Sequence, residues 1–238
     1  MDNLKKSFKS LKWYEIVMII IMVVIAGMQV YKALVNPSSS DTPLWLTIIN
    51  FISAICGIMC IFFCAKASIS NFSFGAVNTI VYAIYLFYEK IYGTFALEVL
   101  FYLPVNFISW YIWAKHRDQK YLEKTKSKRL TLTQNILSTL AIVVGGIVYH
   151  YILVRIGGEV AWLDAFTLSI GIVAVILEMF RYKEQYVWWV ITDVIAVAMY
   201  IAHFDPVYLT KKSIYLIMAV IGLINWTKLN RERNKQNE

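Results

Sequence analysis

The chain has 238 residues, of which 59% are hydrophobic and 16% are charged, and its net charge is +8. Soluble globular domains are about 45–50% apolar and about 25% charged, so this composition does not suit a surface that faces water. Its 16 tyrosines, 13 phenylalanines and 8 tryptophans exclude a disordered chain, because disordered chains are poor in aromatic residues. The composition therefore indicates an integral membrane protein.

Long uncharged stretches predict where the chain crosses a bilayer. A transmembrane helix needs about 20 apolar residues, and eight such stretches follow one another along the chain. We expect helices over residues 13–34, 42–65, 67–88, 91–115, 131–154, 160–180, 184–202 and 206–228. Pro104 removes a backbone hydrogen bond within the fourth stretch and predicts a kink there. The sequence predicts an all-α membrane protein with eight transmembrane helices, and its short loops exclude a soluble catalytic domain.

The positive charges predict how these helices are oriented. The run after the N-terminal lysines is too long for a signal peptide, so we expect it to remain as a helix. With eight spans, 18 of the 23 lysines and arginines fall on the side of the N-terminus. Cytoplasmic loops carry such an excess, so both termini are predicted to be cytoplasmic. The net charge thus reflects topology, no nucleic-acid partner is expected, and the basic loop 116–130 is predicted to touch anionic lipid.

A weak internal repeat joins the second to fourth spans with the sixth to eighth. Tyr102 and Trp113 recur 113 residues later as Tyr215 and Trp226, while the third and seventh spans align best at an offset of 115 residues. Because a single linker helix lies between the two triplets, both triplets start outside and finish inside. They are therefore parallel repeats. We therefore expect an extra N-terminal segment and helix, two three-helix repeats joined by a basic loop and a linker helix, and a cytoplasmic tail. Their predicted ranges are 1–34, 42–115, 116–130, 131–154, 160–229 and 230–238.

Polar and aromatic residues within the spans predict a binding cavity, because polar side chains are costly in a bilayer unless they have a function. Asp193 is a mid-span carboxylate with no basic residue on its own predicted helix, so we expect it to be neutral, hydrated or paired with a cation. Cross-helix hydrogen bonds or interfacial anchoring are the structural alternatives. The predicted substrate-binding residues are Asn78, Tyr82, Asn106, Trp110, Gln185, Tyr186, Trp189, Asp193 and Tyr215. They suit a flat aromatic solute, especially a cationic one.

Other functional classes find less support in the sequence. An intramembrane enzyme needs a nucleophile and base or metal ligands at membrane depth, and the chain has neither an HExxH nor a GxSxG motif. Cys56, Cys60 and Cys64 lie on one helical face without a histidine, which predicts a packing surface and no metal site. No P-loop is present, so ATP-driven transport by this chain alone is excluded. A transporter without a cofactor is predicted, with an enzyme and a receptor or scaffold as the alternatives.

Several of these segments, taken in order, resemble the PnuC family of bacterial vitamin transporters over residues 42–230. They are Tyr102-Leu103-Pro104 with Asn106, Trp110 and Trp113; Glu184 to Trp189 with Asp193; Gly75 to Asn78; and Tyr215 with Gly222 and Trp226. A family motif of one glutamine and two tryptophans is matched by Gln185, Tyr186 and Trp189. Tyr186 stands in place of the first tryptophan, and Trp188 lies close by.

The resemblance implies a SWEET-like three-one-three fold with an added N-terminal helix. It also implies a homotrimer in the bacterial cytoplasmic (inner) membrane and facilitated diffusion of nicotinamide riboside, a vitamin B3 precursor. A cytoplasmic kinase would then trap the vitamin by phosphorylation. Thiamine, riboflavin and deoxynucleosides are the alternative cargoes, because other family members carry them.

Overall fold

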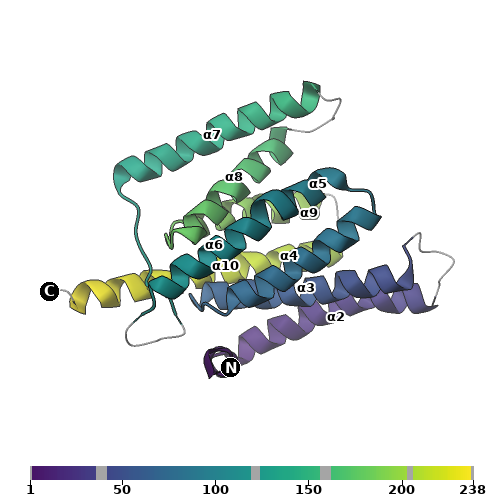
Figure 1. The fold of residues 1–238 in the computed structure, drawn as a ribbon, viewed down its shortest axis with the longest axis horizontal. Helices are drawn as coiled ribbons and strands as arrows, with labels where there is room; N and C mark the ends of the chain where they lie inside the picture. The colour runs from purple at the N-terminus through teal and green to yellow at the C-terminus, as the bar shows by residue number, and fades with distance from the viewer. Residues whose placement is uncertain (1, 36–41, 119–123, 156–161, 203–205, 237–238) are drawn as a thin grey trace. The chain divides into compact units, whose positions relative to one another are not determined.

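The computed structural model describes all residues except 1, 36–41, 119–123, 156–161, 203–205 and 237–238. Its regular elements are helical (Figure 1). They are α1 (Asp2–Lys9), α2 (Trp13–Val35), α3 (Leu44–Ala65), α4 (Asn71–Tyr88), α5 (Tyr92–Leu97), the π-helical turn η2 (Glu98–Tyr102), α6 (Leu103–Lys115), α7 (Leu132–Arg155), α8 (Trp162–Met179), α9 (Gln185–Ala202) and α10 (Pro206–Gln236). The prediction of an all-α chain is confirmed.

Six helices in the described part of the chain are long and apolar enough to cross a membrane. They cover Trp13–Val35, Leu44–Ala65, Tyr92–Lys115, Leu132–Ile152, Gln185–Ala202 and Val207–Glu232. Helix α4 is not among them, and the described apolar part of α8, Ala165–Met179, is shorter. Many large apolar side chains on these helices are exposed, including 77% of Leu132 on α7 and 77% of Leu100 in η2. A bilayer is the solvent that such surfaces require.

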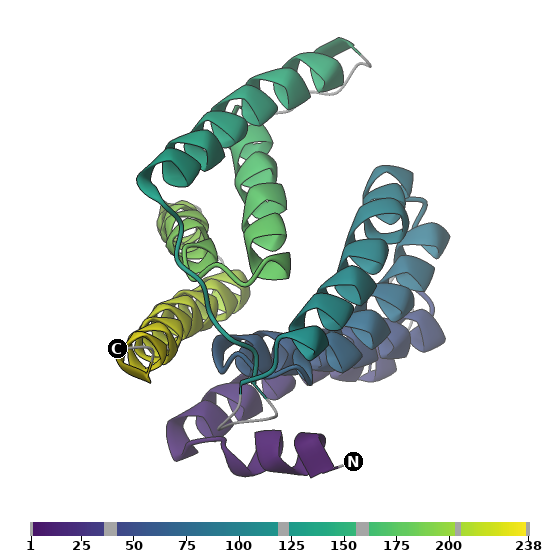
Figure 2. The same cartoon turned by 60° about the vertical axis from the view of Figure 1, so that its left-hand side comes forward.

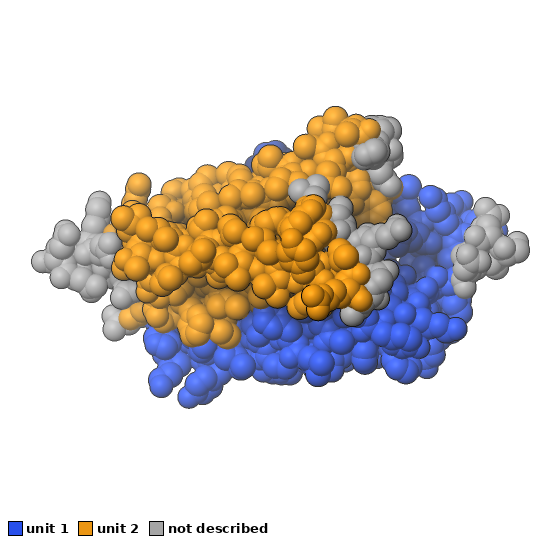
Figure 3. Space-filling model, turned by 90° about the horizontal axis from the view of Figure 1, so that it is seen from above, with its two compact units in different colours: residues 1–125 blue, residues 126–238 orange. Residues whose placement is uncertain are grey.

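The chain divides into two compact units, residues 1–125 and residues 126–238 (Figure 3). In the first unit α2 packs on α3, α3 on α4, and α4 on η2 and α6. In the second unit α7 packs on α8, α8 on α9, and α9 on α10 (Figure 2). Within each unit, therefore, consecutive long helices are also neighbours in space, as is common for sequential elements.

The same tight turn ends α3 in the first unit and α8 in the second. Ala67 and Arg181 lie 114 residues apart, and both have a left-handed backbone, with φ of 56° and 68°. The Ser68 amide donates to the Phe63 carbonyl over 2.9 Å, and the Tyr182 amide donates to the Leu177 carbonyl over 2.8 Å. These are the six-to-one hydrogen bonds of a Schellman motif. Left-handed non-glycine residues are uncommon, so their recurrence at one spacing supports the internal repeat.

The matching helix bounds revise the spacing of that repeat. Helices α4 and α9 each have 18 residues and begin 114 residues apart, at Asn71 and Gln185. This register replaces the offset of 115 expected from the sequence. Further along, Tyr102 and Tyr215 are 113 residues apart, so the first unit contains one additional residue before Tyr102.

The π-helical turn η2 contains the place where the spacing changes. A π-turn arises when one residue is inserted into an α-helix, and η2 spans Glu98–Tyr102. The amide of Leu103 donates to the Glu98 carbonyl at its end. Pro104 follows directly and has no amide hydrogen to donate. The distortion predicted at this proline is therefore a π-turn just before it, which leads into α6.

The N-terminal helix α1 is attached to the turn after α3. The Lys66 ammonium lies 2.7 Å from the Glu15 carboxylate, and both side chains are buried. Lys66 also donates to the Ser10 carbonyl, and the Ser7 hydroxyl lies 2.7 Å from that of Ser68. Burial lowers the pKa of Lys66, and the hydrogen bond and charge of Glu15 oppose this shift. We call these five residues the N-terminal clasp.

The described ends of the basic loop bind to the two turns, each within its own unit. In the first unit, the Thr125 amide donates to the Ala67 carbonyl over 2.9 Å. In the second unit, the Lys128 amide donates to the Arg181 carbonyl over 2.8 Å, and the Lys183 amide donates back to Lys128 over 3.1 Å. These bonds satisfy backbone groups that the tight turns would otherwise leave unpaired.

Candidate functional site

The nine predicted binding residues divide between the two units. Asn78, Tyr82, Asn106 and Trp110 lie on α4 and α6 of the first unit, and Gln185, Tyr186, Trp189, Asp193 and Tyr215 lie on α9 and α10 of the second.

Tyr186 lies against the backbone of α10 in the second unit. Only 5% of Tyr186 is exposed, and its ring meets that of Trp226 with centroids 5.7 Å apart and planes at 66°. A Cβ atom on Gly222 would lie 2.3 Å from Tyr186 Cε1. Glycine is therefore required here, because any side chain would displace the tyrosine ring. Trp226 is itself fully buried, so it packs inside the unit and is not an interfacial anchor.

Asp193 has a cationic partner on the next helix. The Lys212 ammonium lies 3.4 Å from Asp193 Oδ1, with 7% of the aspartate side chain and 31% of the lysine side chain exposed. Lys212 also lies 5.6 Å from the centroid of the Tyr215 ring. The expected pairing of Asp193 with a cation is thus present, and it brings Asp193 and Tyr215 to one place. Lys212 was not among the predicted binding residues.

Two buried amides lie at the start of α4 and of α9. Asn71 and Gln185 are both 0% exposed and occupy matching positions 114 residues apart. None of their side-chain oxygen or nitrogen atoms has a hydrogen-bond partner. An unpaired buried amide costs about 1–3 kcal/mol, so such groups call for a functional or hydration partner. Asn71 was not among the predicted binding residues, although its position at the matching helix start could have identified it.

The predicted residues of the first unit make mainly structural contacts. The Ser53 hydroxyl donates to Asn78 Oδ1 over 2.9 Å, and Tyr82 stacks on Tyr85 with centroids 6.0 Å apart. Asn106 faces Gly75, where a Cβ atom would lie 2.3 Å from its Nδ2. Its Oδ1 is buried without a partner. Trp110 is 38% exposed.

In the first unit, a hydroxyl occupies the position that matches Asp193, and a carboxylate occupies the position that matches Lys212. Thr79 matches Asp193, and Glu98 matches Lys212, both at 114 residues. The side chains of Thr79 and Glu98 are hydrogen-bonded to each other. Matching positions thus link α4 to η2 in the first unit and α9 to α10 in the second. The side chains at these positions carry different charges in the two units.

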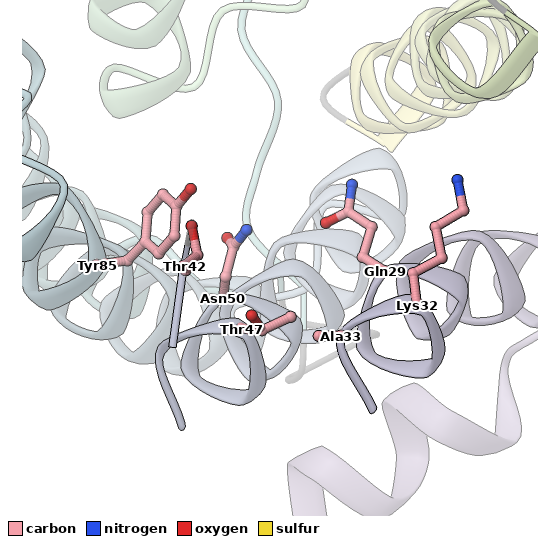
Figure 4. Close-up of a pocket in the computed structure, with 7 residues that line it drawn as sticks. All are labelled: Gln29, Lys32, Ala33, Thr42, Thr47, Asn50 and Tyr85. Atoms are coloured by element: carbon pink, nitrogen blue, oxygen red, sulfur yellow. The ribbon is translucent and has the colours of Figure 1, made fainter. Parts of the chain in front are cut away.

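A cavity of about 310 Å³ lies in the first unit (Figure 4). It is lined by Gln29, Lys32, Ala33, Thr42, Thr47, Asn50 and Tyr85. The polar ends of several of these side chains point to the same side, as Figure 4 shows. None of the nine predicted binding residues lines it, although Tyr85 stacks on Tyr82. The described residues include no group of three or more His, Cys, Asp or Glu side chains able to hold a metal ion.

Comparison with known proteins identifies the class to which this fold and these residues belong. The model of the nicotinamide mononucleotide transporter family matches residues 45–228. The chain therefore belongs to this family of membrane transporters, the family of the PnuC proteins.

Individual relatives agree with this assignment. The chain is 34% identical to the nicotinamide riboside transporter PnuC of Neisseria mucosa over 220 residues, which cover 88% of this chain and 80% of the relative. It is 29% identical to the protein of the same name from Haemophilus influenzae, with 98% of each covered. A crystal structure of the vitamin B3 transporter PnuC matches with a TM-score of 0.73 and 30% identity over 98% of each chain. The relatives are bacterial transporters and not enzymes, so this chain is a multi-pass membrane protein of that class.

Proposed function

We propose that this protein carries nicotinamide riboside across the membrane by facilitated diffusion. The observation that carries the proposal is the end-to-end match to a vitamin B3 transporter, which covers 98% of both chains. The chemistry of the second unit supports it, because the Asp193 carboxylate and the Tyr215 ring share the Lys212 ammonium as a neighbour and together suit a flat cation. Nicotinamide riboside is such a cation, with a pyridinium ring, an amide and a ribose.

The proposed architecture has eight transmembrane helices, with an extra N-terminal helix followed by a SWEET-like three-one-three bundle. The repeated turns at Ala67 and Arg181 support two equivalent triplets. We keep the predicted domain ranges 1–34, 42–115, 116–130, 131–154, 160–229 and 230–238. The excess of lysine and arginine on one side supports cytoplasmic termini and a location in the bacterial inner membrane.

The proposed binding residues are the nine predicted ones. Trp189, Tyr186 and Trp110 would stack on the base, since aromatic pairs contribute about 0.5–1.5 kcal/mol beyond the area they bury. The amides of Asn78, Asn106 and Gln185 would hydrogen-bond the carboxamide or ribose. Gln185 has no hydrogen-bond partner in the structure, so a ligand that reached this buried side chain would find both ends of its amide unpaired. Tyr82 and Tyr215 complete the aromatic lining, and Asp193 balances the ring's charge.

The proposed cargo is the riboside and not the mononucleotide for which the family model is named. Phosphate recognition favours an arginine or lysine that is free to meet it. In the structure Lys212 is paired with Asp193, whose negative charge would repel a phosphate at the same place. Retention in the cell would come from a cytoplasmic kinase, and a homotrimer is the proposed assembly; both rest on the family resemblance.

Uptake by proteoliposomes tests the transport function. Purified full-length protein would be reconstituted without ATP or an ion gradient, and entry of labelled nicotinamide riboside would be compared with empty vesicles. We expect saturable uptake and counterflow, inhibition by excess nicotinamide riboside, and little inhibition by the mononucleotide. Thiamine, riboflavin and deoxynucleosides would be tested as competitors. Absence of counterflow with every one of these solutes would contradict the proposal.

Variants in the same assay test the binding residues. Trp189→Ala is expected to lower uptake by about tenfold or more, because it removes a stacking ring. Tyr111→Ala is the matched control, since Tyr111 is an aromatic residue that is 69% exposed on α6. Equal losses in the two variants, at equal amounts of reconstituted protein, would contradict the assignment of Trp189.

A further inference from the structure

The ion pair between α9 and α10 is asymmetric in its exposure. The Asp193 carboxylate is buried, with 7% of its side chain exposed, whereas 31% of the Lys212 side chain is exposed. Their closest oxygen and nitrogen atoms are 3.4 Å apart, which is long for a charge-assisted hydrogen bond. Lysine carries its charge on a flexible four-carbon stem. The carboxylate is thus held in the protein, and the ammonium can leave it toward the exposed side.

An aromatic ring lies beside the pair. The Lys212 ammonium is 5.6 Å from the centroid of the Tyr215 ring, within the range of a cation–π contact. The ammonium therefore contacts both a carboxylate and a ring face. A flat organic cation would seek the same two partners, because its charge is attracted to the carboxylate and its ring stacks on the phenol.

We propose that Lys212 is the internal occupant of the cation site at Asp193 and Tyr215, and that a cationic substrate displaces it. The inference rests on the proposed function and deepens it, because it assigns a residue that selects substrates by charge. A buried carboxylate without a partner is costly. Exchange of one cation for another keeps Asp193 paired in both the empty and the loaded protein.

The exchange favours cationic cargo over neutral cargo. A neutral nucleoside or flavin that displaced the Lys212 ammonium would leave the Asp193 carboxylate without a positive partner. Lys212 therefore disfavours the binding of neutral ligands, because they bring no charge to replace its own. A pyridinium nucleoside compensates for the loss because it brings its own positive charge. The ligand class is therefore N-substituted aromatic cations that carry a polar sugar or side chain.

The adjacent lysine offers a matched control. Lys211 lies 5.7 Å from the same Tyr215 ring and is also half-buried, but the structure records an ion pair with Asp193 for Lys212. Removing either lysine takes away one positive charge from the same turn of α10. Only the removal of Lys212 takes away the competitor for the carboxylate.

The experiment measures binding to purified full-length protein by titration calorimetry. The ligands are nicotinamide riboside and its uncharged 1,4-dihydro form, which has the same ribose and carboxamide. Lys212→Met is expected to tighten binding of the cation by about three- to tenfold and to leave the dihydro form within about twofold. Lys211→Met and Lys212→Arg are expected to keep the wild-type ratio of the two affinities. Asp193→Asn is expected to weaken binding of the cation more than binding of the dihydro form, and to abolish the effect of Lys212→Met.

Two results would overturn the inference. One is a Lys212→Met protein that binds both ligands with equally changed affinity, and the other is one that binds the cation more weakly than wild type. Lys212→Gln, which keeps a polar group on α10, replaces the methionine variant if that protein does not fold. If wild-type protein binds nicotinamide riboside and Lys212→Met leaves the ratio of the two affinities unchanged, only this inference is contradicted. Wild-type protein that binds neither ligand and shows no transport contradicts the proposed function itself.

Discussion

The two units use one backbone plan with different side-chain chemistry. Each has a Schellman turn with a left-handed residue, a buried amide at the next helix start, and a fully buried tryptophan that meets an aromatic ring. In the first unit the rings of Phe72 and Trp113 have centroids 4.7 Å apart and planes at 86°. In the second the rings of Tyr186 and Trp226 have centroids 5.7 Å apart and planes at 66°. The shared features hold the helices together. The differing residues are therefore the better candidates for function.

Charge is the main difference between them. The first unit has its buried ion pair at the N-terminal clasp, between Lys66 and Glu15, outside the repeated helices. The second has its pair within the repeated helices, between Asp193 and Lys212. An ion pair at a helix end stabilises an attachment, whereas one inside a membrane-spanning pair of helices marks a functional position. The comparison thus separates the ion pair of the N-terminal clasp from the pair at which we propose that a substrate binds.

The largest effect is expected from removing either buried tryptophan. Trp113→Ala and Trp226→Ala should each destabilise the protein by about 3–5 kcal/mol, because both side chains are fully buried and leave a cavity. Thermal unfolding in detergent would measure the loss, with Tyr111→Ala as the exposed control. Similar losses in both variants would support equivalent roles, and a loss in only one would break the comparison.

Breaking the N-terminal clasp should come next. Glu15→Gln leaves the buried Lys66 ammonium without its carboxylate and should cost about 3 kcal/mol. A Glu15→Gln/Lys66→Met double variant should recover much of this loss, because it removes both charges. Thermal unfolding and limited proteolysis of the N-terminal segment would report it. A single variant as stable as wild type would show that the clasp contributes nothing to stability.

Gly222 tests the position where the two aromatic pairs differ. Its counterpart in the first unit is Ser109, 113 residues earlier, so Gly222→Ser makes the second unit resemble the first. The added Cβ atom would meet Tyr186, and such overpacking costs about 1–3 kcal/mol. We expect a lower Tm and weaker substrate binding, while Ser109→Gly leaves binding unchanged. Normal binding by Gly222→Ser would remove Tyr186 from the proposed site.

A smaller effect is expected from pH at Lys66. Burial lowers the pKa of this lysine in the folded protein below its ordinary value. Between these two values the unfolded chain binds more protons than the folded protein, so the contribution of Lys66 to stability rises with pH there. Stability should rise with pH within this window, and Lys66→Met should abolish the rise. The free energy of unfolding would be measured for wild type and Lys66→Met from neutral pH up to the ordinary pKa of lysine. A wild-type stability that falls with pH relative to the variant would contradict the prediction.

The smallest effect on stability is expected at the buried amides. Asn71→Leu and Gln185→Leu replace groups that have no hydrogen-bond partner, so each should change stability by about 1 kcal/mol or less and can raise it. Gln185→Leu should nevertheless lower nicotinamide riboside uptake strongly. Full uptake by this variant would show that its amide serves packing and does not touch the substrate.

Much of the fold could be predicted from the sequence because the helices depend on local composition. Uncharged runs and polar connections placed α2, α3, α7 and α9 to within a few residues, whereas α10 continues to Gln236, eight residues beyond its predicted end. The π-turn η2 could not be placed in this way, since a one-residue insertion leaves the hydrophobic pattern nearly unchanged. The N-terminal clasp was missed for a different reason. Its contact between Glu15 and Lys66 joins residues 51 positions apart, and nothing in either segment indicates the other.

The length, hydrophobicity and charge of the chain by themselves determined that this is a membrane protein. The spacing of polar and aromatic residues then predicted a site for a flat aromatic solute, especially a cationic one, and Asp193 was expected to be neutral, hydrated or paired with a cation. The tertiary structure decided which cation pairs with it, because Lys212 reaches Asp193 only when α9 and α10 pack together. It also decided which aromatic residues are buried, since the exposure of Trp113, Trp226 and Trp110 depends on neighbouring helices and not on their own sequence.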